Sequence, residues 1–296
     1  MRERLKRVVL KTTVRETVPG VRIPLPPPLW SARDESTVCI LTSQNMPNRV
    51  TVEICVDSIE SALAADRGGA DRIELCSNLA EGGVTPSAGL IATVLSKVSL
   101  AVFVMIRPRG GDFCYSADEF RAMQQDVATA KQLGADGVVF GLLNEDGRVD
   151  VARTHQLVEI ARPLKITFHR AFDVARDLNE AIEELVRAGV DRVLTSGGEL
   201  SASLGRIKVA ELNRAAKDRI IVMAGAGITE QNVRELLVET GVREIHASLR
   251  TPVSSPMRYR NEKVSFGGAG SRDYERFIVL EERVRALREA ASQTED

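Results

Sequence analysis

Ionisable and thiol side chains stand near the ends of several β-branched segments of this sequence. The segment Ile166–Asp173 (ITFHRAFD) places a histidine and an arginine after its apolar residues, with an aspartate three residues beyond the arginine. Glu53 and Cys55 lie two residues apart near the end of another such segment, and His246 and Ser248 have the same spacing in a third. Because side chains alternate along a strand, each of these pairs points to one face. Side chains of these types transfer protons, bind anions or hold a metal ion.

The residues at segment ends divide into candidates for catalysis and candidates for ligand binding. The catalytic candidates are Glu53, Glu74, Arg107, His169 and Asp173, and the binding candidates are Arg109, Arg170 and His246. In an enzyme, His169 or Glu74 would act as the general base. Arg107 and Arg109 would hold an anionic substrate, and Asp173 would orient the histidine or the neighbouring arginine. The structural alternative is that Glu53 or Glu74 pairs with Arg107 and neutralises a polar interior layer.

Two glycine-containing turns are further candidates for ligand binding. Gly225 and Gly227 lie in a strand-to-helix turn whose bare amides could face an anion at the start of a helix. This segment lacks the third glycine of a dinucleotide-binding motif, so it is a poor match to that motif. Ser196 and Gly197 line the neighbouring turn. Tight-turn geometry without any ligand is the alternative for both turns.

The elements that position these residues alternate between short β-branched segments and longer amphipathic ones, from Val50 onward. This alternation is typical of βα units around a parallel sheet. Helix-start signals lie between the strands, among them the capping-box residues Ser116 and Glu119. The expected strands are Val50–Val56, Arg72–Cys76, Ala101–Arg107, Gly137–Gly141, Lys165–Arg170, Arg192–Ser196, Ile220–Ala224 and Glu244–Ser248.

An internal repeat predicts how these strands are arranged. Four stretches begin with a glycine and a small apolar residue and continue into a strand, and their glycines are Gly69, Gly134, Gly189 and Gly241. Each interval is about two βα units long, which marks the even-numbered strands of a closed (β/α)8 TIM barrel. An open doubly wound sheet is the alternative, but it would not ordinarily repeat in this way. In such a barrel the carboxyl ends of the strands form the site, so we expect the candidate residues to meet there.

Two segments flank the repeating part of the chain. Residues 1–48 form an irregular extension that we expect to be poorly ordered, because the stretch Ile23–Pro28 (IPLPPP) disfavours helix and sheet. Residues 49–296 form a single barrel domain that includes a C-terminal helix. The apolar stripe of this helix, which docks on the barrel or mediates self-association, consists of Phe277, Leu280, Val284, Leu287 and Ala291.

Composition excludes several classes of protein. The formal net charge is −1, so the chain lacks the basic surface that nucleic acid or an anionic membrane would require. No apolar run approaches the length of a membrane span, and the first residues lack the apolar core of a secretory signal. The cysteines form no C-x-x-C pair. We therefore expect a cytoplasmic protein with free thiols, neither a zinc knuckle nor a thioredoxin-type redox centre.

Seven blocks of this sequence resemble the CutC-type copper homeostasis family. They are Val52–Ser58, Gly68–Ser77, Glu81–Pro86, Met105–Phe113, Phe168–Asp173, Leu194–Gly198 and Ala224–Ile228. The resemblance spans about residues 50 to 265. It implies a TIM barrel, a cytoplasmic location, a homodimer or higher homo-oligomer, and a role in the control of copper.

By the same resemblance, Cys55 and Cys76 are the proposed Cu(I) ligands. Cu(I) is soft and favours thiolates, so two inward thiols on adjacent strands could suffice. The alternative is that both cysteines are buried small hydrophobes. Two thiols also leave the arginines and the Phe168–Asp173 block unexplained. The sequence therefore keeps a second hypothesis open: an uncharacterised TIM-barrel enzyme that acts on a small anionic or phosphorylated metabolite at the C-terminal mouth of the barrel.

Overall fold

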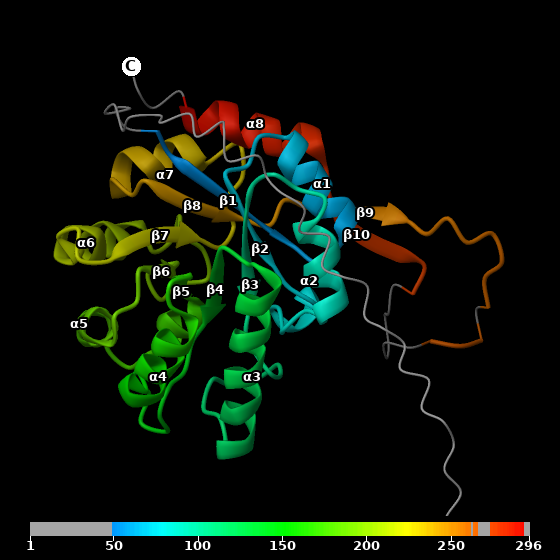
Figure 1. Cartoon of the computed structure of the whole chain (residues 1–296). Helices are drawn as coiled ribbons and strands as arrows, with labels where there is room; N and C mark the ends of the chain where they lie inside the picture. The colour runs from blue at the N-terminus through cyan, green and yellow to red at the C-terminus, as the bar shows by residue number, and fades with distance from the viewer. Residues whose placement is uncertain (1–48, 262, 266–272, 293–296) are drawn as a thin grey trace, which may run out of the picture. The chain divides into compact units, whose positions relative to one another are not determined.

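The computed structural model describes residues 49–261, 263–265 and 273–292 (Figure 1). The expectation of a poorly ordered extension over residues 1–48 lies outside this range. Within the described residues, no helix is both long enough and apolar enough to cross a lipid bilayer.

Eight parallel strands close into a barrel in the order of the chain, with β1 hydrogen-bonded to both β2 and β8. This confirms the expected (β/α)8 TIM barrel, and each strand end lies within two residues of its expected position. The strands are β1 (Thr51–Val56), β2 (Arg72–Leu75), β3 (Ala101–Met105), β4 (Gly137–Phe140), β5 (Lys165–Phe168), β6 (Arg192–Thr195), β7 (Ile221–Gly225) and β8 (Glu244–Ala247).

Helices follow the strands and form the outer layer (Figure 1). The expected capping box is present, since Ser116 and Glu119 each accept a hydrogen bond from the other's backbone amide. Gly134 ends the same helix with a φ of 89°, a left-handed conformation that glycine adopts at little cost. The helices are α1 (Ile59–Arg67), α2 (Ala88–Leu95), α3 (Ala117–Leu133), α4 (Val151–Ala161), α5 (Leu178–Ala188), α6 (Arg206–Ala216) and α7 (Val233–Thr240), with short 3-10 turns η2 (Leu79–Glu81) and η3 (Arg170–Val174).

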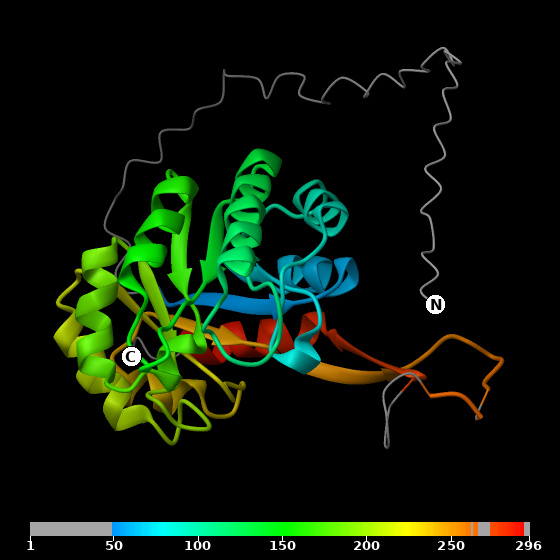
Figure 2. The same cartoon turned by 90° about the horizontal axis from the view of Figure 1, so that it is seen from below.

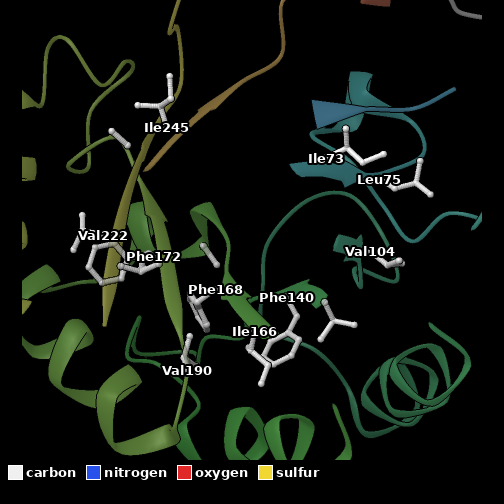
Figure 3. Close-up of a cluster of buried hydrophobic side chains, with 14 of the residues drawn as sticks. Ile73, Leu75, Val104, Phe140, Ile166, Phe168, Phe172, Val190, Val222 and Ile245 are labelled. Carbon is white, nitrogen blue, oxygen red and sulfur yellow. The ribbon is translucent and has the colours of Figure 1, made fainter. Parts of the chain in front are cut away.

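The two faces of each strand have different environments. Outward-facing side chains such as Ile73, Leu75 and Val104 pack under the helices as part of the main apolar core (Figure 3). The inward-facing residues alternate with them, and a small separate apolar cluster includes Cys55, Cys76 and Phe103. The period of two along each strand therefore directs the neighbouring polar residues into the barrel.

After β8 the chain forms an antiparallel pair, β9 (Arg250–Ser254) and β10 (Glu275–Val279), which extends away from the barrel (Figure 2). The apolar stripe predicts that Phe277 and Leu280 belong to the C-terminal helix, and this boundary is wrong. Phe277 lies in β10, because an aromatic residue followed by the β-branched Ile278 and Val279 favours a strand.

The C-terminal helix α8 (Glu281–Ser292) docks on the barrel flank against α1 and α7. Val284, Leu287 and Ala291 on its inner face are buried, as the apolar stripe predicts. The approach to α1 is close, since a Cβ atom on Gly68 would lie 2.5 Å from Cβ of Val284. A glycine is therefore required where α1 ends.

Candidate functional site

Charged side chains fill the middle of the barrel. Arg72 donates hydrogen bonds to Glu53 and to Glu244, the latter with a nitrogen–oxygen distance of 2.6 Å. Arg192 donates to both carboxylate oxygens of Glu244 at 2.5 and 2.9 Å. The ring of Phe103 lies 4.8 and 5.5 Å from the two guanidinium carbons. These four charges neutralise one another, as buried charges must. We call Glu53, Arg72, Arg192 and Glu244 the ionic layer.

Sequence reasoning missed three members of the ionic layer. Arg72, Arg192 and Glu244 are the first residues of their strands, whereas the residues predicted from the sequence lie near the strand ends. The available signal was the period of two, because Arg72 precedes Glu74 by two residues and Glu244 precedes His246 by two. The alternative pairing of Glu53 with Arg107 does not occur, since Glu53 contacts Arg72 and His246 instead.

His246 connects the ionic layer to the next layer of the barrel. Its Nδ1 atom lies 2.7 Å from Oε1 of Glu53. Burial alone would raise the pKa of Glu53, but the charge of Arg72 and the hydrogen bond from His246 outweigh it and lower that pKa to about 2. Burial would also lower the pKa of His246, but the charge of Glu74 and hydrogen bonds to Cys55 and Glu53 raise it well above its ordinary value. The pair is therefore an imidazolium and a carboxylate at neutral pH.

Thiol, carboxyl and imidazole groups meet above this pair. The Sγ atoms of Cys55 and Cys76 lie 3.8 Å apart, and Sγ of Cys76 lies 3.5 Å from Oε2 of Glu74. Nε2 of His246 lies 3.8 Å from the same oxygen. One ligand atom from each of Cys55, Glu74 and His246 fits within 4.8 Å of the others, so the three groups could share one metal ion. We call Cys55, Glu74, Cys76 and His246 the thiol cluster.

The two thiols differ in acidity. A hydrogen bond from Cys76, helped by His246 and opposed by burial, lowers the pKa of Cys55 to about 5. The hydrogen bond to Cys55, together with burial, raises the pKa of Cys76 well above its ordinary value. Burial and the charge of Cys55 likewise raise the pKa of Glu74. The cluster therefore contains one thiolate, the soft anionic donor that Cu(I) prefers.

The thiol cluster lies beside a cavity of about 340 Å³ at the carboxyl ends of the strands. Seven sequence-predicted residues line it: Cys55, Glu74, Arg107, His169, Arg170, Asp173 and His246. Glu53 and Cys76 are fully buried and lie outside the lining. Arg109, Ser196, Gly197, Gly225 and Gly227 do not line it either. The wall also contains Glu81, Gly82, Met105, Phe113, Val174 and Leu194, which the sequence analysis did not single out.

His169 is held with its ring in a fixed orientation. The amide of Ala171 donates to its Nδ1 atom at 3.1 Å, and the ring lies against Gly141, where a Cβ atom would come within 2.5 Å of it. Burial and the charge of Arg107 lower the pKa of His169 from 6.5 to about 3. The buried Nε2 atom has no hydrogen-bond partner among the described residues. Within the described residues, no hydrogen bond joins Asp173 to His169, so the predicted role of Asp173 in orienting this ring has no contact to support it.

Arg107 holds the loops around the cavity together. Its Nη1 atom donates to the carbonyl oxygens of Glu81 and Gly83 at 2.6 and 2.9 Å, and Nη2 donates to that of Gly111 at 2.8 Å. Its guanidinium carbon lies 5.0 Å from the centre of the Phe113 ring. Within the described residues, no carboxylate lies within ion-pair distance of this buried arginine. Carbonyl dipoles and the face of the Phe113 ring therefore balance its positive charge.

Asp173 organises the turn after β6. Its carboxylate accepts hydrogen bonds from the amides of Ser196 and Gly198 and from the hydroxyl of Thr195. Arg170 pairs with the same carboxylate at 2.7 Å. The amides of the Ser196–Gly198 turn are thus occupied by a side chain of this protein, and the contact with Arg170 is compatible with the predicted orienting role of Asp173.

Arg109 does not line the cavity. It pairs with Glu119 at 2.6 Å and with Asp112 at 3.1 Å, and it lies over the ring of Tyr115. The sequence predicts that Arg109 holds an anionic substrate together with Arg107, but β3 ends at Met105, before both residues. The alternation of a strand does not continue into the loop, so Arg109 was free to turn outward.

Comparison with known proteins supports one family. The model of the CutC family matches residues 50–251. A CutC family protein of Chromobacterium violaceum is 49% identical over 239 residues, which cover 81% of this chain and 97% of that protein. The human copper homeostasis protein cutC homolog is 48% identical over 241 residues, 81% of this chain and 88% of its own length. A crystal structure from Streptococcus agalactiae, of a protein that carries the CutC name, aligns with a TM-score of 0.64 at 35% identity and covers 67% of this chain and 97% of that one.

Proposed function

The chain belongs to the CutC family, and from this premise we propose that it serves copper homeostasis by binding Cu(I) in the cytoplasm through Cys55 and Cys76. The observation that carries the proposal is the 3.8 Å separation of their sulfur atoms. With metal–sulfur bonds of about 2.3 Å, two thiolates on one ion lie at most about 4.6 Å apart. The separation is therefore compatible with one shared ion and no movement of the backbone.

The surrounding groups suit the same ion. Neutral imidazole nitrogen is a good ligand for copper, and the Nε2 atom of His246 lies in the thiol cluster, where it could bind the ion after losing its proton. Cys55 lines the cavity, whereas Cys76 is fully buried behind it. An ion would thus reach Cys55 first and Cys76 second. Binding displaces the proton of Cys76, because the thiolate is the form that coordinates metal.

A competition experiment with a Cu(I)-specific chelator tests this function. The double variant Cys55→Ser with Cys76→Ser should lose the capture of Cu(I), because hydroxyl groups are hard ligands. Cys114→Ser is the matched control, since Cys114 is an exposed free cysteine outside the cavity lining and should leave capture intact. Unchanged affinity in the double variant would contradict the proposal.

The size of the cavity favours a second candidate function, catalysis on a small anionic metabolite. A metal ion needs far less than the 340 Å³ available, which falls in the range of about 300–1,000 Å³ that is typical of small-molecule sites. Thermal unfolding in the presence of small anionic metabolites, with and without phosphate, tests it. Stabilisation by a member of this set supports the candidate, and the absence of any shift across the set counts against it.

A further inference from the structure

His169 presents a hydrogen-bond donor that has no acceptor. The amide of Ala171 donates to Nδ1, so this nitrogen carries a lone pair and the proton of the neutral ring lies on Nε2. The low pKa of His169, about 3, keeps the ring neutral at physiological pH. Nε2 is buried without a partner among the described residues, and the side chain lines the cavity. An unpaired buried donor is unfavourable, so an acceptor atom from a ligand would be stabilising here.

Two arginines line this part of the cavity. Arg107 is buried and carries its charge without a carboxylate partner in the described chain, as shown above. Arg170 pairs with Asp173 through Nε and with Ser196 through Nη2, while its Nη1 atom has no partner there. The charge of Arg107 acts at the His169 ring, so a ligand oxygen bound to His169 would lie near a positive charge. This favours a carboxylate over a neutral acceptor.

The rest of the wall limits what the anion can be. Met105, Phe113 and Leu194 provide apolar surface for a short hydrocarbon part. Glu81 also lines the cavity, so a dianion such as a phosphate monoester would meet like charge. The amides that could hold a phosphate in the turn after β6 already bind Asp173. A small molecule with a single carboxylate fits these limits better than a phosphorylated one.

We propose that the cavity binds a small monocarboxylic acid, with an oxygen of its carboxylate accepting a hydrogen bond from Nε2 of His169 in the field of Arg107 and Arg170. This assigns to His169 a role as donor, not as general base. The assignment deepens the second candidate function, on which it rests in part, by naming the class of small molecule. It does not depend on copper, because His169 and Arg107 lie outside the thiol cluster.

Binding of isobutyrate to the metal-free full-length protein, measured by calorimetry and ligand-observed NMR, tests the proposal. Isobutyramide is the matched uncharged probe, since it has nearly the same shape without the carboxylate. We expect saturable binding of isobutyrate and none of the amide. Nitrogen NMR of the histidine side chains should show the Nε2–H tautomer of His169 and a shift of that nitrogen on addition of isobutyrate.

The variant His169→Phe keeps the volume of the ring and removes the donor. It should weaken isobutyrate binding by at least about tenfold, the effect expected for a lost hydrogen bond to a charged group. His155→Phe makes the same change at an exposed position on α4 and should bind as the unaltered protein does. Equal binding of the amide, full binding by His169→Phe, or the Nδ1–H tautomer would each overturn the proposal, as would no binding at millimolar isobutyrate. None of these results decides whether the protein captures copper or catalyses a reaction, which the separate assays above measure.

Discussion

Nδ1 of His246 lies 2.7 Å from Oε1 of Glu53, a carboxylate that is fully buried in the barrel. Through this contact the ionic layer is joined to the thiol cluster. The other oxygen of Glu53 pairs with Arg72, which in turn contacts Glu244. Glu53 and Arg72 therefore set the orientation and charge of His246, although neither of them lines the cavity.

The variant Glu53→Gln should destabilise the protein and lower the pKa of His246. An amide cannot neutralise Arg72 and His246, and breaking a buried ion pair typically costs about 3–5 kcal/mol. Denaturant unfolding measures the first effect, and an NMR titration of the His246 ring measures the second. Glu60→Gln is the control, because Glu60 pairs with Arg276 at the surface with half of its side chain exposed. A difference of less than about 1 kcal/mol between the two variants would show that Glu53 does not stabilise the barrel through charge.

The fold was predictable because its signal repeats. The glycines Gly134, Gly189 and Gly241 each end a helix in the left-handed conformation before an even-numbered strand. This single repeat therefore predicted where helices end, where the next strands begin and how many strands the barrel has. The pair β9 and β10 was missed because it occurs once, and its two strands pair across a long intervening segment that carries no periodic signal.

The site was predictable only where a strand imposes its alternation. Glu74 and His246 follow from the period of two, and both line the cavity. Arg109 and the turn after β6 lie beyond strand ends, where the backbone follows local hydrogen bonds. The tautomer of His169 depends on the amide of Ala171, a contact made by a 3-10 turn that the sequence did not indicate.

The low pKa of His169 predicts how stability depends on pH. The unfolded residue binds a proton near pH 6.5, whereas the folded residue does so only near pH 3. Between these values the unfolded state holds the extra proton, so the free energy of unfolding falls as the pH falls. At pH 4 the loss from this residue is about 3 kcal/mol at most.

Denaturant unfolding at pH 7 and pH 4 measures this effect. The variant His169→Phe lacks the titrating group, so its stability should fall less between the two values than that of the unaltered protein. His155→Phe, the same substitution at an exposed position of α4, is the control against which the slope of His169→Phe is compared. Identical slopes for all three proteins would mean that His169 takes up its proton while folded.

The variant Asp173→Asn should loosen the turn after β6. Both carboxylate oxygens accept hydrogen bonds, and an amide group would turn two hydrogens toward donors such as the Ser196 amide. The side chain is only 5% exposed, so a loss of about 2–3 kcal/mol is expected. Hydrogen exchange of the Ser196 and Gly198 amides should accelerate. Asp118→Asn, with 84% of its side chain exposed, should change neither quantity, and unchanged exchange in Asp173→Asn would contradict the proposed role.

Gly141 should be essential for ligand binding although it offers the ligand no functional group. A Cβ atom at this position would lie 2.5 Å from the His169 ring and 2.8 Å from Cβ of Ala171. In Gly141→Ala the ring must therefore move and release the Ala171 amide, which fixes the proton on Nε2. We expect isobutyrate binding to be lost and the free energy of unfolding to fall by about 1–3 kcal/mol, as in other overpacked interiors.

The control for this variant is Gly89→Ala in α2. The nearest atom to a Cβ at Gly89 is Oγ of Ser87 at 4.0 Å, so alanine fits there and should raise stability by up to about 1 kcal/mol. Calorimetry with isobutyrate and denaturant unfolding of both variants provide the measurement. Normal isobutyrate binding by Gly141→Ala, despite the expected fall in stability, would show that the ring of His169 tolerates displacement. Glycine at position 141 would then matter only for packing, because isobutyrate binding would not require the Nε2 donor of His169 to stay in its fixed position.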